Sequence, residues 1–193
     1  MILVITSEFT VPNETTVINQ MFGEGLDVLH VRKPLISRNE MIDFLCKIDE
    51  AFYPRLALHT HHDLGKDNRI SRIHYREADR KEKKYKPCKD GKNIISTSVH
   101  DISAYNTLEK EWEYAFISPF FPSISKKGYG ENSMVMKNIG QRNNPDVKLI
   151  ALGGIHPDNI QQVLETGVDG VALLGAIWGN DNPLSVFKQC LKL

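Results

Sequence analysis

The hydrophobic residues of this chain form two alternating patterns. Short, almost continuous apolar runs of strand length recur along the sequence. Most of them precede a segment in which apolar residues return every three or four positions, as on one face of a helix. Strands without polar alternation are typical of parallel sheets that helices cover. The runs predict eight strands, at residues 2–5, 27–32, 55–59, 70–75, 93–99, 114–118, 149–152 and 170–174.

This alternation predicts an α/β protein, a compact (β/α)8 TIM barrel that forms one domain over residues 1–193. Helix signals agree with it. Ser37 and Glu40 have the spacing of a capping box before an apolar helical pattern that reaches residue 52. Asn182-Pro183 is a typical start for the last helix. Eight strand–helix units in 193 residues leave room only for short helices.

Two segments depart from the pattern. Residues 76–92 contain eight basic and four acidic residues and have no apolar face. This composition predicts a solvated loop, with a poorly formed helix after the fourth strand, rather than a nucleic-acid-binding surface. Residues 119–133 have the length and the glycine, serine and lysine content of a mobile lid.

Composition and charge exclude several classes of protein. The 24 basic and 24 acidic residues leave no net charge, so we expect no nucleic-acid or membrane partner. The apolar start of the chain is only five residues long and has no basic leader, so we expect no signal peptide or spanning helix. Cys46, Cys88 and Cys190 form no C-x-x-C pair, which is typical of a reduced, cytoplasmic compartment. The helical patterns around Cys46 and Cys190 predict small core residues there.

Glycines at the ends of the last two strands indicate a phosphate site. Gly153 and Gly154 follow the seventh strand, and Gly175 follows the eighth. Without side chains, their backbone N–H groups can approach a phosphate closely. The loops after these two strands are the usual phosphate site of (β/α)8 barrels. The alternative is that the glycines only permit tight turns.

The other strand ends carry polar groups that a barrel brings to one rim, where its chemistry is located. Arg32 and Lys126, with nearby serine hydroxyls, would form a wall for a phosphate or carboxylate. His100, with an ordinary pKa near ~6.5, could carry a proton to and from a carbon acid. The alternative for His100 is a hydrogen bond to the next helix. Six of the seven histidines lie at or near this rim: His30, His59, His61, His62, His74 and His100.

A metal site is a further possibility that the spacing disfavours. His59, His61 and His62, with His30 and His74, could bind zinc. On a strand, however, His59 and His61 point one way and His62 the other, and only Asp63 is placed to complete a site. The residues therefore predict no metal site here, and Asp63 more simply begins a short helix.

Four segments resemble those of thiamine-phosphate synthase and thiazole tautomerase (TenI-like) barrels: LHVRKP, ISTSVH, SPFFPSISKKG and ALGGIHPDNIQQVLETGVDGVALLGAI. The resemblance covers nearly the whole chain and implies a compact (β/α)8 barrel. It implies that backbone N–H groups at Gly154 and Gly175 hold the phosphate of a thiazole. It also implies that a loop carrying Ser123, Ser125 and Lys126 closes over the substrate.

The synthase branch of this family differs from the chain at key positions. Its second strand has Gln-x-Arg-x-Lys, where this chain keeps Arg32, has His30 for the glutamine and has Lys33 one step early. Its Asn-Asp pair binds a pyrimidine diphosphate and magnesium, and His59-Thr60 stands there. Asp79 is a weak candidate for a second magnesium ligand. Because histidine and threonine are poor replacements for a magnesium carboxylate, we expect weak synthase activity or none.

The tautomerase branch matches at Ser98-Val99-His100, whose histidine would be the acid/base during aromatisation of a thiazole carboxylate phosphate. This reaction needs no cofactor, and Arg32 would hold the carboxylate. We therefore predict a TenI-like thiazole tautomerase with His100 and Arg32 as catalytic residues. The first alternative is a divergent synthase that uses Mg²⁺ and releases diphosphate. The second is a non-catalytic barrel that binds thiazole phosphate and acts on a regulator.

The expected partner is a small phosphorylated thiazole. His30, Lys33, His59 and Ser98 would contact it beside the lid residues named above. An apolar helix face within residues 36–52 would allow a homodimer.

Overall fold

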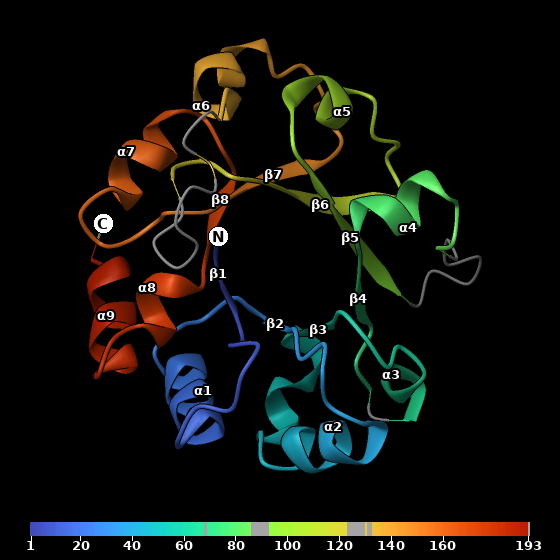
Figure 1. Cartoon of the computed structure of the whole chain (residues 1–193), viewed down its shortest axis with the longest axis vertical. Helices are drawn as coiled ribbons and strands as arrows, with labels where there is room; N and C mark the ends of the chain where they lie inside the picture. Colours follow the sequence, from blue (N-terminus) through green and yellow to red (C-terminus); the bar gives the residue numbers. More distant parts are fainter. Residues whose placement is uncertain (68, 86–92, 123–129, 131–132, 193) are drawn as a thin grey trace.

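The computed structural model describes residues 1–67, 69–85, 93–122, 130 and 133–192. Eight parallel strands close a barrel in the order β1 to β8, with β8 paired to β1 (Figure 1). This confirms the predicted (β/α)8 fold. Their bounds agree with the apolar runs to within two residues. The strands are β1 (Ile2–Ile5), β2 (Val28–Val31), β3 (Leu56–Leu58), β4 (Arg72–Tyr75), β5 (Ile94–Val99), β6 (Trp112–Ile117), β7 (Lys148–Leu152) and β8 (Gly170–Leu173).

Short helices surround this ring of strands (Figure 1). Most have six residues or fewer, as the length of the chain requires, and two 3₁₀ helices supplement them. The helices are α1 (Glu14–Gly23), α2 (Arg38–Leu45), η1 (Glu50–Arg55), α3 (Leu64–Asp67), α4 (Glu77–Lys81), α5 (Ile102–Asn106), α6 (Val135–Asn138), η2 (Ile139–Gln141), α7 (Ile160–Glu165), α8 (Gly175–Trp178) and α9 (Pro183–Cys190).

The predicted capping signals begin two of these helices. The Ser37 hydroxyl accepts from the Glu40 amide at 3.3 Å, and the Glu40 carboxylate accepts from the Ser37 amide at 2.7 Å, which completes a capping box before α2. Asn182 caps α9 by accepting from the Ser185 amide at 3.1 Å. However, α2 ends at Leu45 rather than near residue 52. Asp49 accepts from the Ala51 amide at 2.9 Å and begins η1 instead.

The charged segment after β4 forms only a single short helix. α4 has five residues, Glu77–Lys81, and none of them is buried. A helix without an apolar face gains little from packing on the barrel, so the segment stays short. The expected poorly formed helix is therefore confirmed. Residues 86–92 of the segment lie outside the described part of the chain, as do Ser123, Ser125 and Lys126 of the predicted lid.

The core has two layers because successive strand residues point to opposite sides. Residues that face outward pack under the helices, and Cys190 lies among them as predicted. Cys46 is exposed, so its prediction as a core residue was wrong. It follows the last turn of α2, beyond the buried Leu45. Eight inward-facing residues fill the barrel: Leu3, Ile5, Val28, Ala57, Tyr114, Phe116, Ile150 and Ala172.

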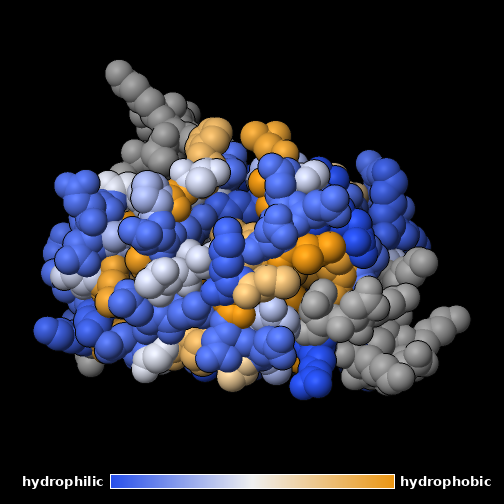
Figure 2. Space-filling view, turned by 90° about the horizontal axis from the view of Figure 1, so that it is seen from below, coloured by the Kyte–Doolittle hydropathy of each residue, from blue (hydrophilic) through white to orange (hydrophobic). Residues whose placement is uncertain are grey.

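The surface is consistent with this packing. Figure 2 shows a face on which hydrophilic side chains predominate and apolar patches are scattered between them. In α2, Met41 and Leu45 are turned into the core of the same chain. No described helix has the length and apolar character needed to cross a membrane.

Candidate functional site

A cavity of about 560 Å³ lies at the carboxyl ends of the strands. All eight strands, or the residues that follow them, contribute to its wall. This is the end of a (β/α)8 barrel at which ligands bind. Of the predicted site residues, six line the cavity: Arg32, His59, Ser98, Gly153, Gly154 and Gly175.

The glycines after β7 and β8 form one side of the cavity. Within the described part of the chain, the amides of Gly153, Gly154 and Gly175 donate no hydrogen bond. A phosphate in the cavity could therefore accept hydrogen bonds from these amides without displacing a protein group.

The glycine pair also has a conformational role. Gly153 and Gly154 have φ angles of +108° and +66°, which favour glycine. A Cβ atom on Gly154 would lie 2.5 Å from the carbonyl oxygen of Pro122. The adjacent segment is bonded to this turn, since the Phe120 amide donates to the Leu152 carbonyl at 2.9 Å. A tight turn thus occurs together with amides that have no hydrogen-bond partner among the described residues, and the phosphate site stays a prediction.

Cationic and hydroxyl groups line the same cavity as the glycines. Arg32 follows β2, and its guanidinium donates to Glu8. Its backbone amide donates to the Thr6 hydroxyl at 2.9 Å, which fixes the loop after the strand. Arg76, which follows β4, also lines the cavity, as does Ser118. The sequence analysis did not single out Arg76, because it was assigned to the charged segment after β4.

Four described residues of the predicted site do not line the cavity: Lys33 and His100, and also His30 and Asp79, whose contacts are given below. Lys33 is 4% exposed, does not line the main cavity, and pairs with the equally buried Glu14 at 2.5 Å. The His100 side chain is 53% exposed, and its Nε2 lies 3.9 Å from a Glu77 carboxylate oxygen. His100 comes after Val99, the last residue of β5, so strand alternation does not fix its direction. It does not line the cavity, whereas Ser98, within the strand, does. The structure therefore does not place the predicted proton carrier beside the predicted phosphate site.

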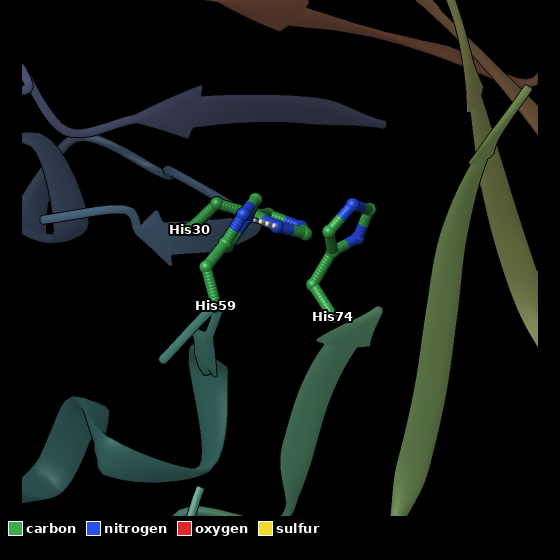
Figure 3. A group of neighbouring side chains, drawn as sticks. All are labelled: His30, His59 and His74. Atoms are coloured by element: carbon green, nitrogen blue, oxygen red, sulfur yellow. Dashed lines mark hydrogen bonds between the residues drawn. The ribbon is translucent and has the colours of Figure 1, made fainter. Parts of the chain in front are cut away.

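Three histidines from adjacent strands converge inside the barrel: His30 of β2, His59 just after β3 and His74 of β4 (Figure 3). The register pairs Leu58 with Ile73, so His59 and His74 face inward side by side. Their rings stack with centroids 4.2 Å apart. His30 Nδ1 lies 2.9 Å from His59 Nε2.

Buried hydroxyl groups hold two of these rings. His30 Nε2 lies 2.7 Å from the Tyr114 hydroxyl, and His74 Nδ1 lies 2.9 Å from Ser96 Oγ. His74 Nε2 lies 3.0 Å from Ser98 Oγ, at the edge of the cavity. Side chains of β5 and β6 thus contact the His30 ring through one nitrogen and the His74 ring through both, while His59 contacts His30.

The cluster is electrically neutral near pH 7. Burial, supported by the positive charge that each ring would present to its neighbours, lowers the pKa of His30 and of His59 well below 6.5. Burial also lowers the pKa of His74 to about 3. The same burial raises the pKa of Tyr114 to about 12.

The histidines next in sequence are not part of this cluster. His61 Nε2 lies 3.1 Å from the Ile36 carbonyl oxygen, and the His62 ring packs edge-on against Tyr75. Of the three histidines in the run His59, His61 and His62, only His59 belongs to the cluster. The sequence feature that indicates the cluster is one histidine at the carboxyl end of each of three consecutive strands, β2, β3 and β4.

The two carboxylates considered as magnesium ligands at this rim, those of Asp63 and Asp79, are paired with arginines. The Asp79 carboxylate is held by Arg76, with contacts of 2.8 and 3.0 Å to its two oxygens. Asp63 is paired with Arg38 at 2.9 Å. The buried Thr60 hydroxyl has no hydrogen-bond partner among the described residues. Because Mg²⁺ is bound through free carboxylates, these residues do not fit the magnesium pair that the resemblance implied.

Comparisons with known proteins agree with the fold. A thiamine-phosphate synthase of Listeria monocytogenes is 33% identical over 103 residues, which are 51% of this chain and 48% of the relative. A thiamine-phosphate synthase of Pyrococcus furiosus is 30% identical over 104 residues, which are 52% of this chain and 48% of the relative. These matches span about half the length of the curated relatives.

Solved structures are similar over almost the whole chain. A thiamine phosphate pyrophosphorylase from Bacteroides thetaiotaomicron has a TM-score of 0.78 at 24% identity, with 99% of this chain and 95% of that chain covered. The one from Pyrococcus furiosus also has a TM-score of 0.78, at 18% identity, with 99% and 93% covered. The family model described as thiamine monophosphate synthase matches residues 1–177. Because this match includes all eight strands, the chain belongs to the thiamine monophosphate synthase family.

Proposed function

We propose that this chain is a synthase that joins a thiazole phosphate to a pyrimidine diphosphate. In this reaction the thiazole nitrogen attacks the methylene carbon of the pyrimidine. A C–N bond forms, the C–O bond to diphosphate breaks, and thiamine phosphate and diphosphate are released. The names of the curated relatives support this reaction, which was the first alternative to the predicted tautomerase.

The observation that carries the proposal is a single cavity that both the glycines and two arginines line. The amides of Gly154 and Gly175 would bind the thiazole phosphate. Arg32 and Arg76 line the same cavity, where they would stabilise the negative charge of the departing diphosphate. The thiazole phosphate and the diphosphate of the pyrimidine would thus both be bound, and holding two reactants in the correct orientation is a large part of catalysis.

The predicted tautomerase has less support. It requires a proton carrier beside the thiazole ring, and His100 was the residue predicted for that role. His100 is half exposed and is absent from the cavity wall. A general acid or base has to reach the proton that it transfers, directly or through one water molecule. The exposed position of His100 therefore favours the synthase reaction.

Magnesium is the cofactor expected of a synthase in this family. Since Asp79 is already bound by Arg76 and Thr60 replaces a carboxylate, we assign no step of the reaction to magnesium. The charge of the diphosphate is assigned instead to Arg32 and Arg76.

The test is to incubate the protein with thiazole phosphate and pyrimidine diphosphate and to measure both products. Thiamine phosphate can be measured by its fluorescent oxidation product, and diphosphate by a coupled assay. Arg32→Ala should lower the rate at least tenfold, or about 1.4 kcal/mol in the transition state. Arg38→Ala is the matched control, because Arg38 pairs with Asp63 and does not line the cavity.

The outcomes are distinct. Thiazole phosphate binding without either product would reject the synthase and support the non-catalytic alternative. A folded protein that does not bind thiazole phosphate at all would overturn the assignment of the cavity. Aromatisation of thiazole carboxylate phosphate that depends on His100 would restore the tautomerase hypothesis.

A further inference from the structure

The histidine cluster has the composition and placement of a metal site that differs from a magnesium pair. The cluster contains no carboxylate: its ligand atoms are the imidazole nitrogens of His30, His59 and His74, which all lie within 4.8 Å of one another. Nitrogen ligands of this kind favour zinc and neighbouring transition metals over magnesium. We propose that His30, His59 and His74 bind a divalent transition-metal ion, zinc in particular, at the base of the cavity. This proposal does not depend on the reaction proposed above.

The distances require only small movements of the side chains. Zinc binds imidazole nitrogen at about 2.0–2.1 Å in tetrahedral geometry, so the ligand nitrogens are separated by about 3.3 Å. His30 Nδ1 and His59 Nε2 are 2.9 Å apart and would have to separate slightly. The remaining pairs are at most 4.8 Å apart and would have to approach. Figure 3 shows the three rings converging from neighbouring strands on one shared space.

The surrounding hydroxyl groups already orient two of the ligands. The Tyr114 hydroxyl lies at His30 Nε2 and Ser96 Oγ lies at His74 Nδ1. Metal-binding histidines usually use the second ring nitrogen in this way, for a hydrogen bond that fixes the ring. The nitrogens left for a metal are then Nδ1 of His30 and Nε2 of His74, with Nε2 of His59. An ion bound there would replace two present contacts, the one between His30 Nδ1 and His59 Nε2 and the one between His74 Nε2 and Ser98 Oγ.

A fourth position would be open to the cavity. His59 and His74 line the cavity, while His30 lies fully buried beneath them. Sites with three protein ligands and one open position are typical of zinc that acts on a ligand, whereas structural zinc sites have four protein ligands. An oxygen of a molecule in the cavity, or a water molecule, would occupy the open position. The ion would therefore meet whatever the cavity binds.

The ordinary alternative is that the three rings are only a hydrogen-bonded part of the core. This alternative makes a different prediction, because a core network does not need an ion and does not bind one with defined stoichiometry. Variants of the three histidines then distinguish the alternatives, provided that the variants fold. His59 is the best position to change, since it is only partly buried and its ring nitrogen contacts His30 alone.

The experiment uses the full chain without an affinity tag, in a background in which Cys46 and Cys88 are serine, so that thiols cannot bind the ion. After removal of metals and addition of zinc, elemental analysis should find about one zinc ion per chain. Competition with a chromophoric chelator gives the dissociation constant. His59→Asn and His74→Ala should each raise it at least 100-fold. His62→Ala and His156→Ala, which change histidines outside the cluster, should leave it within about threefold.

A second measurement addresses geometry. Cobalt(II) in place of zinc should give the visible absorption of a four-coordinate nitrogen site, and His59→Asn should abolish it. Circular dichroism checks that each variant is folded. The proposal is overturned if the folded Cys46→Ser, Cys88→Ser protein with all its histidines binds no zinc at micromolar concentrations. It is also overturned if His59→Asn and His74→Ala in this background are folded and both bind zinc as the parent protein does, or if His62→Ala loses it equally.

Discussion

Lys33 was predicted to contact the substrate, but in the structure it forms a buried ion pair with Glu14, and this role can be tested by substitution. Its ammonium group is 4% exposed and contacts the Glu14 carboxylate at 2.5 Å. It also donates to the Phe9 carbonyl at 3.0 Å, and Glu14 accepts from the Ser7 amide at 3.2 Å. Ser7 and Phe9 line the cavity. The Lys33–Glu14 pair therefore supports the backbone of the cavity-lining residues Ser7 and Phe9 and does not itself line the cavity.

Replacing Lys33 with methionine leaves a buried carboxyl group without its cation. Removing one partner of a buried ion pair costs about 3–5 kcal/mol. For a chain of this size, each kcal/mol lowers the melting temperature by about 2–4 °C. The expected fall for Lys33→Met near neutral pH is therefore about 6–20 °C. Methionine keeps much of the volume of the lysine stem, so the loss should come mainly from the charge.

The loss should also depend on pH, with a defined sign. In the wild type, burial raises the pKa of Glu14, while Lys33 lowers it. Removing Lys33 removes the lowering effect, so the pKa of Glu14 rises further in the folded state. A group with a raised folded pKa gives its full stability below the unfolded pKa, near 4.5. That stability is lost as pH rises through the folded pKa. Lys33→Met should be closest to the wild type at about pH 5 and furthest from it at about pH 8.

The assay is chemical denaturation of both proteins across this pH range. The double variant Glu14→Gln with Lys33→Met is the control, since it removes both charges and should recover much of the stability. Binding of thiazole phosphate is measured on folded Lys33→Met at low temperature and should remain close to that of the wild type. A stability loss that is equal at both pH values would refute the electrostatic argument. A binding loss in the folded variant would return Lys33 to the substrate.

Three further predictions concern single positions. Gly154→Ala should lower the free energy of unfolding by about 2–4 kcal/mol, because Gly154 has a positive φ and a Cβ there would clash with the Pro122 carbonyl oxygen. Gly140→Ala is the control, since a Cβ at Gly140 meets open space, and it should change thermal denaturation little. Equal losses in the two variants would contradict the clash. A thiol reagent at about pH 8 should modify Cys46 before Cys190, because Cys46 is exposed and burial raises the pKa of Cys190 to about 11; the reverse order would be incompatible with the burial. His100→Asn should keep thiamine phosphate formation within about twofold, and a loss above tenfold would give His100 a catalytic role.

The sequence predicted the barrel well because the information is local and repeated. Each strand is an apolar run with few polar interruptions, and eight such runs in series leave little choice of fold. Capping at Ser37 and Asn182 was predictable for the same reason, because each cap involves residues only three apart. Element ends were less predictable: α2 ends early because Asp49 caps a competing 3₁₀ helix, and its side chain was not a conspicuous signal.

The sequence indicated the cavity lining best where the residue type alone determines what is exposed, and less well where the direction of a side chain matters. The glycines after β7 and β8 line the cavity, since a residue without a side chain exposes its backbone there; that they bind phosphate stays a prediction. Lys33 and His100 were assigned to the substrate from their positions near strand ends. Those predictions failed to consider which face each residue takes: Arg32 and Ser98 line the cavity, whereas Lys33 is buried behind it and His100 lies outside it. One residue along the chain separates Lys33 from Arg32, and His100 lies beyond Val99, the last residue of β5, where strand alternation no longer fixes the direction of a side chain.

The histidine cluster requires an explanation beyond stability. Buried imidazoles lose their hydration, and a polar network inside a core only offsets that loss when every nitrogen is bonded. Here His30 and His74 are bonded to hydroxyls of β5 and β6 and His30 to His59, so the network extends over six side chains that an apolar core would not need. Leucine or valine in these places would fill the barrel without this requirement. Polar groups that cost stability at the base of a cavity are typical of functional sites, and three neutral nitrogens on a shared space are suited to holding a transition-metal ion.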